Sequence, residues 1–412
     1  MAKITSVYAQ EILDSRGKPT LKVCVSAGNA CGDFSVPSGA STGSHEAWEK
    51  RDGDKTRFAG LGVKKVAEKV NTEINKALKG KDAGNQKAID NLLIELDGTP
   101  NKKRLGANAI LGVSVACAKV SAKAKNLELH QYLKTLANIK SSHRVPYLYL
   151  NLINAGKHAS SYLAFQEFMI VPMTQKVEEG LIWADMIKAQ LKKTVVGKYG
   201  PFSANYGDEG GIVIQAKKVR EAFQALTHSI KEAGLKGKVK LAIDAAADSF
   251  YEPKNKKYDI DGKKIKAGAL MDLYKGIVRD FDMISIEDPF FEEEFKNFAQ
   301  LLAFSKTKKT KIVGDDLTVT NPERLCTAIQ NKSIDAIIIK PNQIGTLSET
   351  LDVMKSSREN NIECIISHRS GETGDDFIAD LAYAFGAFGL KSGAPNRFER
   401  IAKYNRLWEI SS

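Results

Sequence analysis

The sequence contains few cysteines, no long apolar run and no recognisable leader segment. No two of its five cysteines form a CxxC pair. We therefore expect free thiols, with no disulfide or zinc framework, at Cys24, Cys31, Cys117, Cys326 and Cys364. No apolar run approaches the roughly 18 residues that suggest a membrane span. The first residues hold neither an apolar signal core nor a small-residue cleavage site. Together these absences predict a cytoplasmic protein without a membrane span.

The chain also lacks internal repeats, low-complexity tracts and nucleic-acid-binding motifs. Its 61 lysines and arginines exceed its 49 aspartates and glutamates, which gives a net charge of +12. A positive field can steer an anionic substrate, but without a motif it predicts no specific nucleic-acid partner. A length of 412 residues with 43% hydrophobic content suits two folded domains, or one barrel with a smaller domain.

The first third of the chain predicts a small α+β domain over residues 1–135. Residues 3–36 alternate apolar and polar positions around a turn at 15–19, which is typical of antiparallel strands. Residues 36–46, VPSGASTGSHE, are rich in glycine and serine, so we expect a loop whose backbone can approach a ligand. From 60 to 135 the apolar positions recur with helical spacing. Small residues crowd the last of these helices, which favours close helix–helix approach.

Residues 136–412 alternate strands with helices, which predicts an α/β barrel of the (β/α)₈ type. Segments 147–156 and 165–172 are predicted strands that precede the regular alternation. Six later strands are short, buried and closed by a polar residue: Asp244, Glu287, Asp315, Lys340, His368 and Lys391. The gaps between these residues, 43, 28, 25, 28 and 23, match the length of βα units. We therefore expect all six side chains in one barrel mouth.

Three of these strand ends are carboxylates, at Asp244, Glu287 and Asp315. Three anions share a site only when something neutralises them. Oxygen ligands without histidine or cysteine suit Mg²⁺. A single acid at a strand end is usually a surface residue, but three in register favour a metal site.

Lys340 would then lie beside a divalent cation and Lys391. Cationic neighbours lower the pKa of a lysine, so Lys340 is a candidate for a neutral base that removes a proton next to a carboxylate. Glu209 in YGDEGG and Glu167 in FQEF are candidates for the general acid if burial raises their pKa. Taken alone, Lys340 would be interpreted as a solvated lysine at a strand exit, and the other strand-end residues reverse that preference.

The segment Ser367-His368-Arg369-Ser370 suits a phosphate, because a guanidinium and a hydroxyl both donate to phosphate oxygens. His158 in NAGKHA adds a further polar side chain, although a lone histidine is more often structural.

These segments give the chain a close resemblance, nearly end to end, to the enolase family. The similar segments include EILDSRGKPT, VPSGASTG, GDEGG, SIEDPF, KPNQIGT, SHRSGET and GDDLTVTNPERL, and the last two are highly specific. The resemblance implies an N-terminal α+β domain on a modified barrel whose first strands break the regular βα order. It implies the reversible dehydration of 2-phosphoglycerate to phosphoenolpyruvate, in glycolysis and gluconeogenesis.

The resemblance also implies a role for each candidate residue. Lys340 would remove the C2 proton, and Glu209, assisted by Glu167, would protonate the departing C3 hydroxyl. Of two Mg²⁺ ions, the first would be bound by Asp244, Glu287 and Asp315, and the second by Ser41 together with substrate. The remaining substrate contacts would be His158, Glu167, His368, Arg369, Ser370 and Lys391.

The resemblance further implies a homodimer, or an octamer of dimers. The usual interface pair would be Lys22 with Glu409 here, with its charges exchanged. Around His158 the chain departs from the usual family pattern at Ala155 and at Ser160-Ser161, and no departure removes a proposed catalytic group.

Two alternatives remain open at this stage. One is an acid-sugar dehydratase or racemase of the same superfamily, although the phosphate-suited SHRS segment favours enolase. The other is a non-catalytic binding protein on the enolase fold, although Lys340, Glu209 and all three metal carboxylates are intact.

Overall fold

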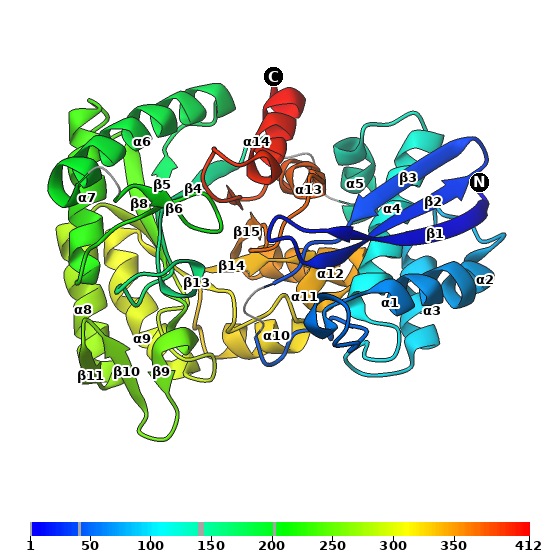
Figure 1. Ribbon diagram of the computed structural model, residues 1–412, viewed down its shortest axis with the longest axis horizontal. Coiled ribbons are helices and arrows are strands. Elements are labelled where there is room, and N and C mark those ends of the chain that lie inside the picture. The colour runs from blue at the N-terminus through cyan, green and yellow to red at the C-terminus, as the bar shows by residue number, and fades with distance from the viewer. Residues whose placement is uncertain (1, 40–42, 139–143, 201–202) are drawn as a thin grey trace.

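The computed structural model describes residues 2–39, 43–138, 144–200 and 203–412. The N-terminal part, blue to cyan in Figure 1, is an antiparallel sheet backed by helices, and it lies beside a larger barrel. Its strands pair in the order β1 (Ile4–Leu13), β2 (Pro19–Ala27) and β3 (Ala30–Ser35). Its helices are α1 (Lys64–Lys69), α2 (Asn75–Leu78), α3 (Gln86–Asp97), α4 (Ala107–Ala124) and α5 (Leu129–Ala137). The α+β character predicted for this part is confirmed.

Helix α4 is the centre of this part and is buried around most of its circumference. Its small residues pack chiefly against strands β2 and β3, so the expected close approach is between helix and sheet more than between helices. Gly32 on β3 is the closest point. A Cβ there would lie 2.3 Å from the backbone nitrogen of Val120 and 2.6 Å from the carbonyl oxygen of Ala116.

We expect Gly32→Ala to lower the free energy of unfolding by about 2–3 kcal/mol, because the added methyl group meets helix backbone that cannot move aside. Chemical denaturation of the purified variant measures the effect. Gly28→Ala is not a suitable control because of its positive φ, so Ser26→Ala on the neighbouring strand serves instead. An unfolding free energy unchanged by Gly32→Ala would contradict the tight contact.

Among the described residues, eight strands close the barrel, in the order β16, β15, β14, β13, β12, β8, β5 and β4, with β16 pairing back to β4. They are β4 (Tyr147–Asn154), β5 (Glu167–Pro172), β8 (Val239–Asp244), β12 (Met283–Glu287), β13 (Lys311–Gly314), β14 (Ala336–Ile339), β15 (Glu363–Ser367) and β16 (Gly389–Lys391). Apolar side chains from these strands, such as Val313 and Ile338, fill the interior. The predicted modified barrel is confirmed.

The barrel helices surround these strands, and most connect one parallel strand to the next (Figure 1). They are α6 (Val177–Tyr199), α7 (Val219–Glu232), α8 (Ala267–Asp280), α9 (Phe295–Ser305), α10 (Pro322–Gln330), α11 (Pro341–Ile344), α12 (Leu347–Glu359), α13 (Phe377–Phe385) and α14 (Phe398–Ser411). Short strands β6 (Asn205–Tyr206) and β7 (Ile212–Val213) extend the sheet at β4, and β9 (Tyr251–Glu252), β10 (Lys257–Ile260) and β11 (Lys263–Ile265) form a separate sheet.

Strand β5 runs antiparallel to both of its neighbours, β4 and β8, whereas the other barrel pairs are parallel. In this register Glu167, the first residue of β5, lies opposite Asp244, the last residue of β8. A reversed strand therefore brings its start, and not its end, to the mouth where the other strands finish.

The structure joins Cys24 and Cys31 in a disulfide between neighbouring strands β2 and β3, with their Cα atoms 6.7 Å apart. The expectation of free thiols is therefore wrong for this pair. The hairpin turn between the two residues brings them together, and counting cysteines does not reveal it. The remaining cysteines are free thiols: buried Cys117, buried Cys364 and exposed Cys326. The cysteines therefore give no support to the predicted cytoplasmic location.

Asp380 on α13 ties the N-terminal part to the barrel. Its carboxylate accepts hydrogen bonds from Nε and NH2 of Arg406 on α14, both at 2.9 Å, and from the backbone N–H of His130 on α5 at 3.0 Å. The Asp380 side chain is fully enclosed, and that of Arg406 is 15% exposed. Burial alone would raise the pKa of Asp380, but the hydrogen bonds from His130 and Arg406 outweigh it and hold the pKa below its usual value.

Asp380→Asn should therefore lower the free energy of unfolding by about 2–3 kcal/mol at pH 7. Because the folded-state pKa is depressed, this contribution is present above the unfolded value of about 3.9 and is lost as pH falls through the lower folded value. The difference in melting temperature between wild type and Asp380→Asn should then shrink between pH 5 and pH 3. A difference that does not change with pH would contradict the ionic role of Asp380.

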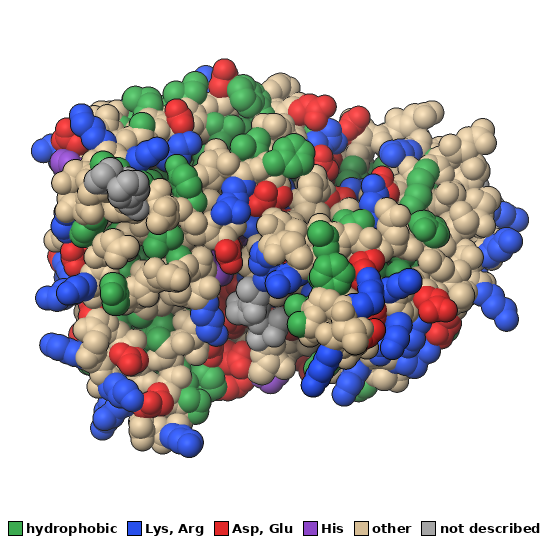
Figure 2. Space-filling view, viewed as in Figure 1, with side chains coloured by type: hydrophobic (Ala, Val, Ile, Leu, Met, Phe, Trp, Pro, Cys, Tyr) green, Lys and Arg blue, Asp and Glu red, His purple; other side chains and the backbone are tan. Residues whose placement is uncertain are grey.

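No helix in the described part of the chain combines the length and the apolar character that a membrane crossing requires. On the face shown in Figure 2, Lys and Arg side chains are scattered over both the N-terminal part and the barrel, with Asp and Glu between them. The excess positive charge on this face is therefore dispersed.

Candidate active site at the barrel mouth

The six strand-end residues lie together at the mouth of the barrel, as their spacing predicted. Asp244, Glu287 and Lys391 are the last residues of β8, β12 and β16, whereas the other three follow β13, β14 and β15 directly. A polar pocket at this mouth is lined by Asp244, Asp315, Lys340, His368 and Lys391, together with Glu46, His158, Gln166, Glu167, Glu209, Ala246, Asp288, Asp316, Ser367, Arg369 and Ser370. Glu287 joins it through its contact with Lys391.

The carboxylates of Asp244, Glu287 and Asp315 are buried, and one oxygen of each lies within 4.8 Å of the others. Lys391 Nζ lies 2.8 Å from Glu287 Oε1 and 3.1 Å from Asp244 Oδ2. Burial and the nearby Asp244 raise the pKa of Glu287 well above its usual value. Three buried oxygen ligands that repel one another make a donor set that fits a divalent cation of the Mg²⁺ type.

Lys340 contacts the carboxylate of Asp315 through its ammonium group. Burial by itself would lower the pKa of Lys340, but the Asp315 carboxylate outweighs burial and raises it. This raised pKa reflects the contact with Asp315, because a carboxylate favours the charged amine. The lowered pKa was predicted for Lys340 beside a divalent cation, and it stays a prediction.

Glu167, Glu209 and His158 form a second buried group at the mouth. His158 Nδ1 lies 3.6 Å from Glu167 Oε1 and 3.6 Å from Glu209 Oε1, while Lys391 Nζ lies 3.3 Å from Glu167 Oε2. Burial is the main cause that raises the pKa of Glu167 well above its usual value, and the Glu209 carboxylate is the second. Burial alone would raise the pKa of Glu209 too, but the rings of His368 and His158 outweigh it and hold the pKa low. Glu167 thus meets the condition set for a general acid, and Glu209 does not.

His368 is fixed between Glu209 and Arg400. Its Nε2 lies 3.4 Å from Glu209 Oε1, and its Nδ1 lies 2.7 Å from the guanidinium NH1 of Arg400. Burial lowers the pKa of His368 to about 4. His368 is consequently a neutral ring at pH 7, and the arginine N–H requires Nδ1 to be the acceptor.

Arg369 and Ser370 come directly after His368 beyond the end of β15, and both line the pocket. The Arg369 guanidinium contacts Glu46 and Asn342, and Ser370 Oγ accepts a hydrogen bond of 3.4 Å from NH1 of Arg16. No role was predicted for Glu46, Asn342 or Arg16. Glu46 and Arg16 lie 323 and 354 positions from their partners, and nothing in the local sequence reveals such contacts. Ser41, the expected ligand of a second cation, lies outside the described residues.

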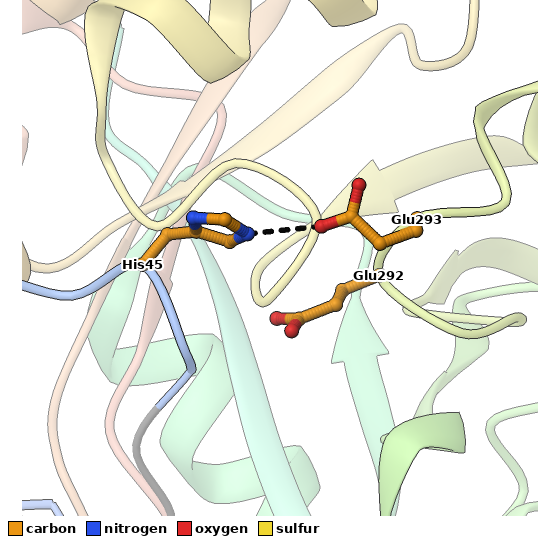
Figure 3. Close-up of side chains that lie close together, drawn as sticks. All are labelled: His45, Glu292 and Glu293. Atoms are coloured by element: carbon orange, nitrogen blue, oxygen red, sulfur yellow. Dashed lines mark hydrogen bonds and ion pairs between the residues drawn. The ribbon is translucent and has the colours of Figure 1, made fainter. Parts of the chain in front are cut away.

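Two further acidic groups border the mouth. The Asp288 carboxylate accepts the backbone N–H groups of Asp315 and Asp316, at 2.9 and 2.6 Å, so it fixes the loop that carries Asp315. His45 approaches Glu292 and Glu293 on the loop after β12, as Figure 3 shows, and its Nε2 lies 2.9 Å from Glu293 Oε1. Arg324 also pairs with Glu293, at 2.7 Å, so this group already has its counter-charge.

The closed barrel, with buried carboxylates and lysines at the carboxyl ends of its strands, defines an acid–base barrel enzyme that uses a divalent metal. Two family models match the chain, "Enolase, N-terminal domain" over residues 4–133 and "Enolase, C-terminal TIM barrel domain" over residues 142–412. Enolase B of Dictyostelium discoideum is 45% identical over 418 residues, covering 99% of this chain and 94% of that protein. The enolase of Methanocaldococcus jannaschii is 46% identical over 410 residues, covering 99% and 95%, and that of Thermococcus gammatolerans is 46% identical over 411 residues, covering 99% and 94%. The chain belongs to the enolase family.

Proposed function

We propose that this protein dehydrates 2-phosphoglycerate to phosphoenolpyruvate in glycolysis, and runs the reverse reaction in gluconeogenesis. The observation that carries the proposal is the meeting of two lysines, three carboxylates and the Arg369–Ser370 pair in one pocket of an enolase-family barrel. Each step of the reaction needs one of these groups: a base for C2, an acid for the C3 hydroxyl, and positive charge for the substrate's anions.

Lys340 is the proposed base that removes the C2 proton. A base must be neutral, whereas contact with Asp315 keeps the Lys340 amine charged. Asp315 is also a proposed metal ligand. Its carboxylate cannot stabilise the Lys340 ammonium and a bound cation to the full extent at the same time. We therefore propose that Lys340 acts in its neutral form, which the neighbouring cations Arg369 and Lys391 favour and which a Mg²⁺ held by Asp244, Glu287 and Asp315 would favour further. The neutral amine then accepts the C2 proton.

Glu209 and Glu167 are the proposed acid pair for the C3 hydroxyl. Because the pKa of Glu167 is raised, we propose that Glu167 supplies the proton that Glu209 passes on; both carboxylates lie 3.6 Å from Nδ1 of His158. Proton transfer from this pair to the departing hydroxyl then yields water. The neutral His368 and the Asn151 amide, whose Nδ2 donates to Glu209 Oε2 at 3.0 Å, hold the Glu209 carboxylate in place.

Two Mg²⁺ ions per site are proposed as cofactors, the first held by Asp244, Glu287 and Asp315 and the second by Ser41 together with substrate. When bound, these ions would supply the positive charge that stabilises a carboxylate losing its α-proton. Lys391 would add charge at the same place, since its ammonium already lies among three carboxylates. His158, Arg369 and Ser370 would complete the contacts to substrate, with the guanidinium and hydroxyl on the phosphate.

The remaining expectations stay proposals. They are a division of the chain at residues 135 and 136, a cytoplasmic location, and a homodimer or an octamer of dimers. Lys22 pairs with Asp33 at 3.0 Å and Glu409 with Arg406 at 3.1 Å within the same chain. A Lys22–Glu409 bridge between subunits would therefore have to replace or share these contacts.

A direct assay tests the proposed reaction. Purified protein is incubated with 2-phosphoglycerate and Mg²⁺, and formation of phosphoenolpyruvate is followed by ultraviolet absorbance. We expect activity that requires Mg²⁺ and is removed by a chelator. Absence of activity above that of a Lys340→Ala variant would defeat the proposal and favour a binding protein on this fold.

A further inference from the structure

Two side chains that perform no step of the reaction, Glu46 and Asn342, hold Arg369 in position through three hydrogen bonds. Glu46 Oε2 accepts from NH1 at 3.0 Å, Glu46 Oε1 accepts from NH2 at 3.2 Å, and Asn342 Oδ1 accepts from NH1 at 3.1 Å. Both N–H groups of NH1 therefore have acceptors, and the paired contact with one carboxylate sets the plane of the guanidinium. Arg369 and Glu46 side chains are 4% and 7% exposed, so water screens this pair little.

Gln343 links this pair to the proposed metal site. The Thr320 hydroxyl accepts the backbone N–H of Lys340 at 3.0 Å and donates to Gln343 Oε1 at 2.8 Å. The amide orientation is thereby fixed, and Gln343 Nε2 donates to Asp315 Oδ1 at 3.0 Å and to Glu46 Oε1 at 3.4 Å. The buried Gln343 amide thus connects Asp315, a proposed metal ligand, with Glu46, the partner of Arg369.

The segment that carries Glu46 is fastened on both sides. Ser44 Oγ donates to Glu292 Oε1 at 2.5 Å, and His45 contacts Glu293 as drawn in Figure 3. The backbone N–H of Ala47 donates to the carbonyl of Gln343 at 2.8 Å. These contacts hold Glu46 toward the pocket before any phosphate arrives.

We infer that Glu46, oriented by Gln343, is the positioning residue that aims the Arg369 guanidinium at the phosphoryl group of the substrate. The inference rests on the phosphate-binding role proposed above for Arg369. Lys340 repels the guanidinium, and after Glu46 the carboxylates that attract it are Asp315 and Glu49. Without the negative charge of Glu46, the Arg369 guanidinium would lose the paired contact that sets its plane.

The test compares Glu46→Gln with wild type and with Glu73→Gln, a matched control in the N-terminal part, where Glu73 pairs with Arg104. For Glu46→Gln we expect KM for 2-phosphoglycerate to rise about 10- to 30-fold, the range of a lost charge-assisted hydrogen-bond pair. Inhibition by inorganic phosphate should weaken by the same factor. The kcat should change less than about threefold, and the Mg²⁺ dissociation constant measured without substrate should stay within about twofold.

Asn342→Ala provides a second variant if Glu46→Gln folds poorly, with an expected rise in KM of about 3- to 10-fold. A double variant distinguishes the positioning role of Glu46 from the phosphate-binding role proposed for Arg369. Because Glu46 acts through Arg369, adding Glu46→Gln to Arg369→Lys should raise KM no further than Arg369→Lys alone. An unchanged or lower KM in both Glu46→Gln and Asn342→Ala, or a loss of Mg²⁺ affinity equal to the rise in KM, would overturn the inference. An unchanged KM in Arg369→Lys would instead defeat the phosphate role of Arg369.

Discussion

Replacing Lys340 with alanine is expected to lower kcat by about 10³- to 10⁴-fold, at the upper end of what a positioned general base contributes. The residue follows a fully buried strand, β14, and its ammonium reaches Asp315 at the centre of the pocket. Alanine removes the amine and leaves the strand intact. Steady-state kinetics of 2-phosphoglycerate dehydration measure the loss. Exchange of the C2 hydrogen with solvent, followed by NMR, should disappear with it.

Lys188→Ala is the control, because Lys188 lies on the outer helix α6 and pairs only with the exposed Asp185. Its kcat should equal that of wild type. A Lys340→Ala enzyme that keeps more than a tenth of wild-type kcat, or that still exchanges the C2 hydrogen, would show that another group takes the proton.

The second large effect is expected from Glu287→Gln, which removes one negative charge from the metal site but keeps the side-chain shape. The dissociation constant for Mg²⁺ should rise by about 10²-fold or more, since one of three carboxylate ligands becomes a neutral amide. At a Mg²⁺ concentration 100 times the wild-type dissociation constant, binding stabilises the native protein by about 2.7 kcal/mol. The same concentration should give the variant only about 0.4 kcal/mol.

Thermal unfolding with and without Mg²⁺ distinguishes this role from a structural one. Without metal, we expect Glu287→Gln to melt no lower than wild type, because burial and Asp244 already make the Glu287 charge costly and Lys391 keeps two other carboxylate partners. Glu363→Gln, on a strand start that pairs with Arg144, is the control and should respond to Mg²⁺ as wild type does. A normal Mg²⁺-induced rise in the variant's melting temperature would exclude Glu287 from the site.

The alternation of strands and helices in the sequence predicted the barrel and six residues at its mouth. It could do so because the carboxyl ends of parallel barrel strands all lie at the same mouth. Each buried strand stops where a polar side chain can reach the pocket, so Asp244 and Lys391 are visible as strand ends even though 147 residues separate them. Glu167 breaks this rule, since it begins a reversed strand. Glu209 lies on no strand at all, and only its GDEGG segment and the family resemblance indicated it.

Contacts between distant segments were not predictable in the same way. Glu46 meets Arg369 across 323 positions, and the sequence around either residue is compatible with a solvated surface. The contact between Lys340 and Asp315 was not predicted either, because the sign of a pKa shift depends on which charges lie close, and sequence order does not specify those distances. The Cys24–Cys31 pair was missed because a hairpin, not a cysteine motif, brings the sulfur atoms together.

The barrel closes between β4 and β16, which pair Tyr147 with Gly389 at opposite ends of this part of the chain. Pairing of β4 with β5 is local and costs little loop-closure entropy. Pairing of β16 with β4, in contrast, must close a loop of about 240 residues. Lys391 arrives on that last strand, so the cation that neutralises Asp244, Glu287 and Glu167 joins them only at closure. During refolding, repulsion among the carboxylates of Asp244, Glu287 and Glu167 therefore opposes assembly of the site until β16 docks. Recovery of activity in a refolding experiment should then report barrel closure itself, and Mg²⁺ present from the start should speed it.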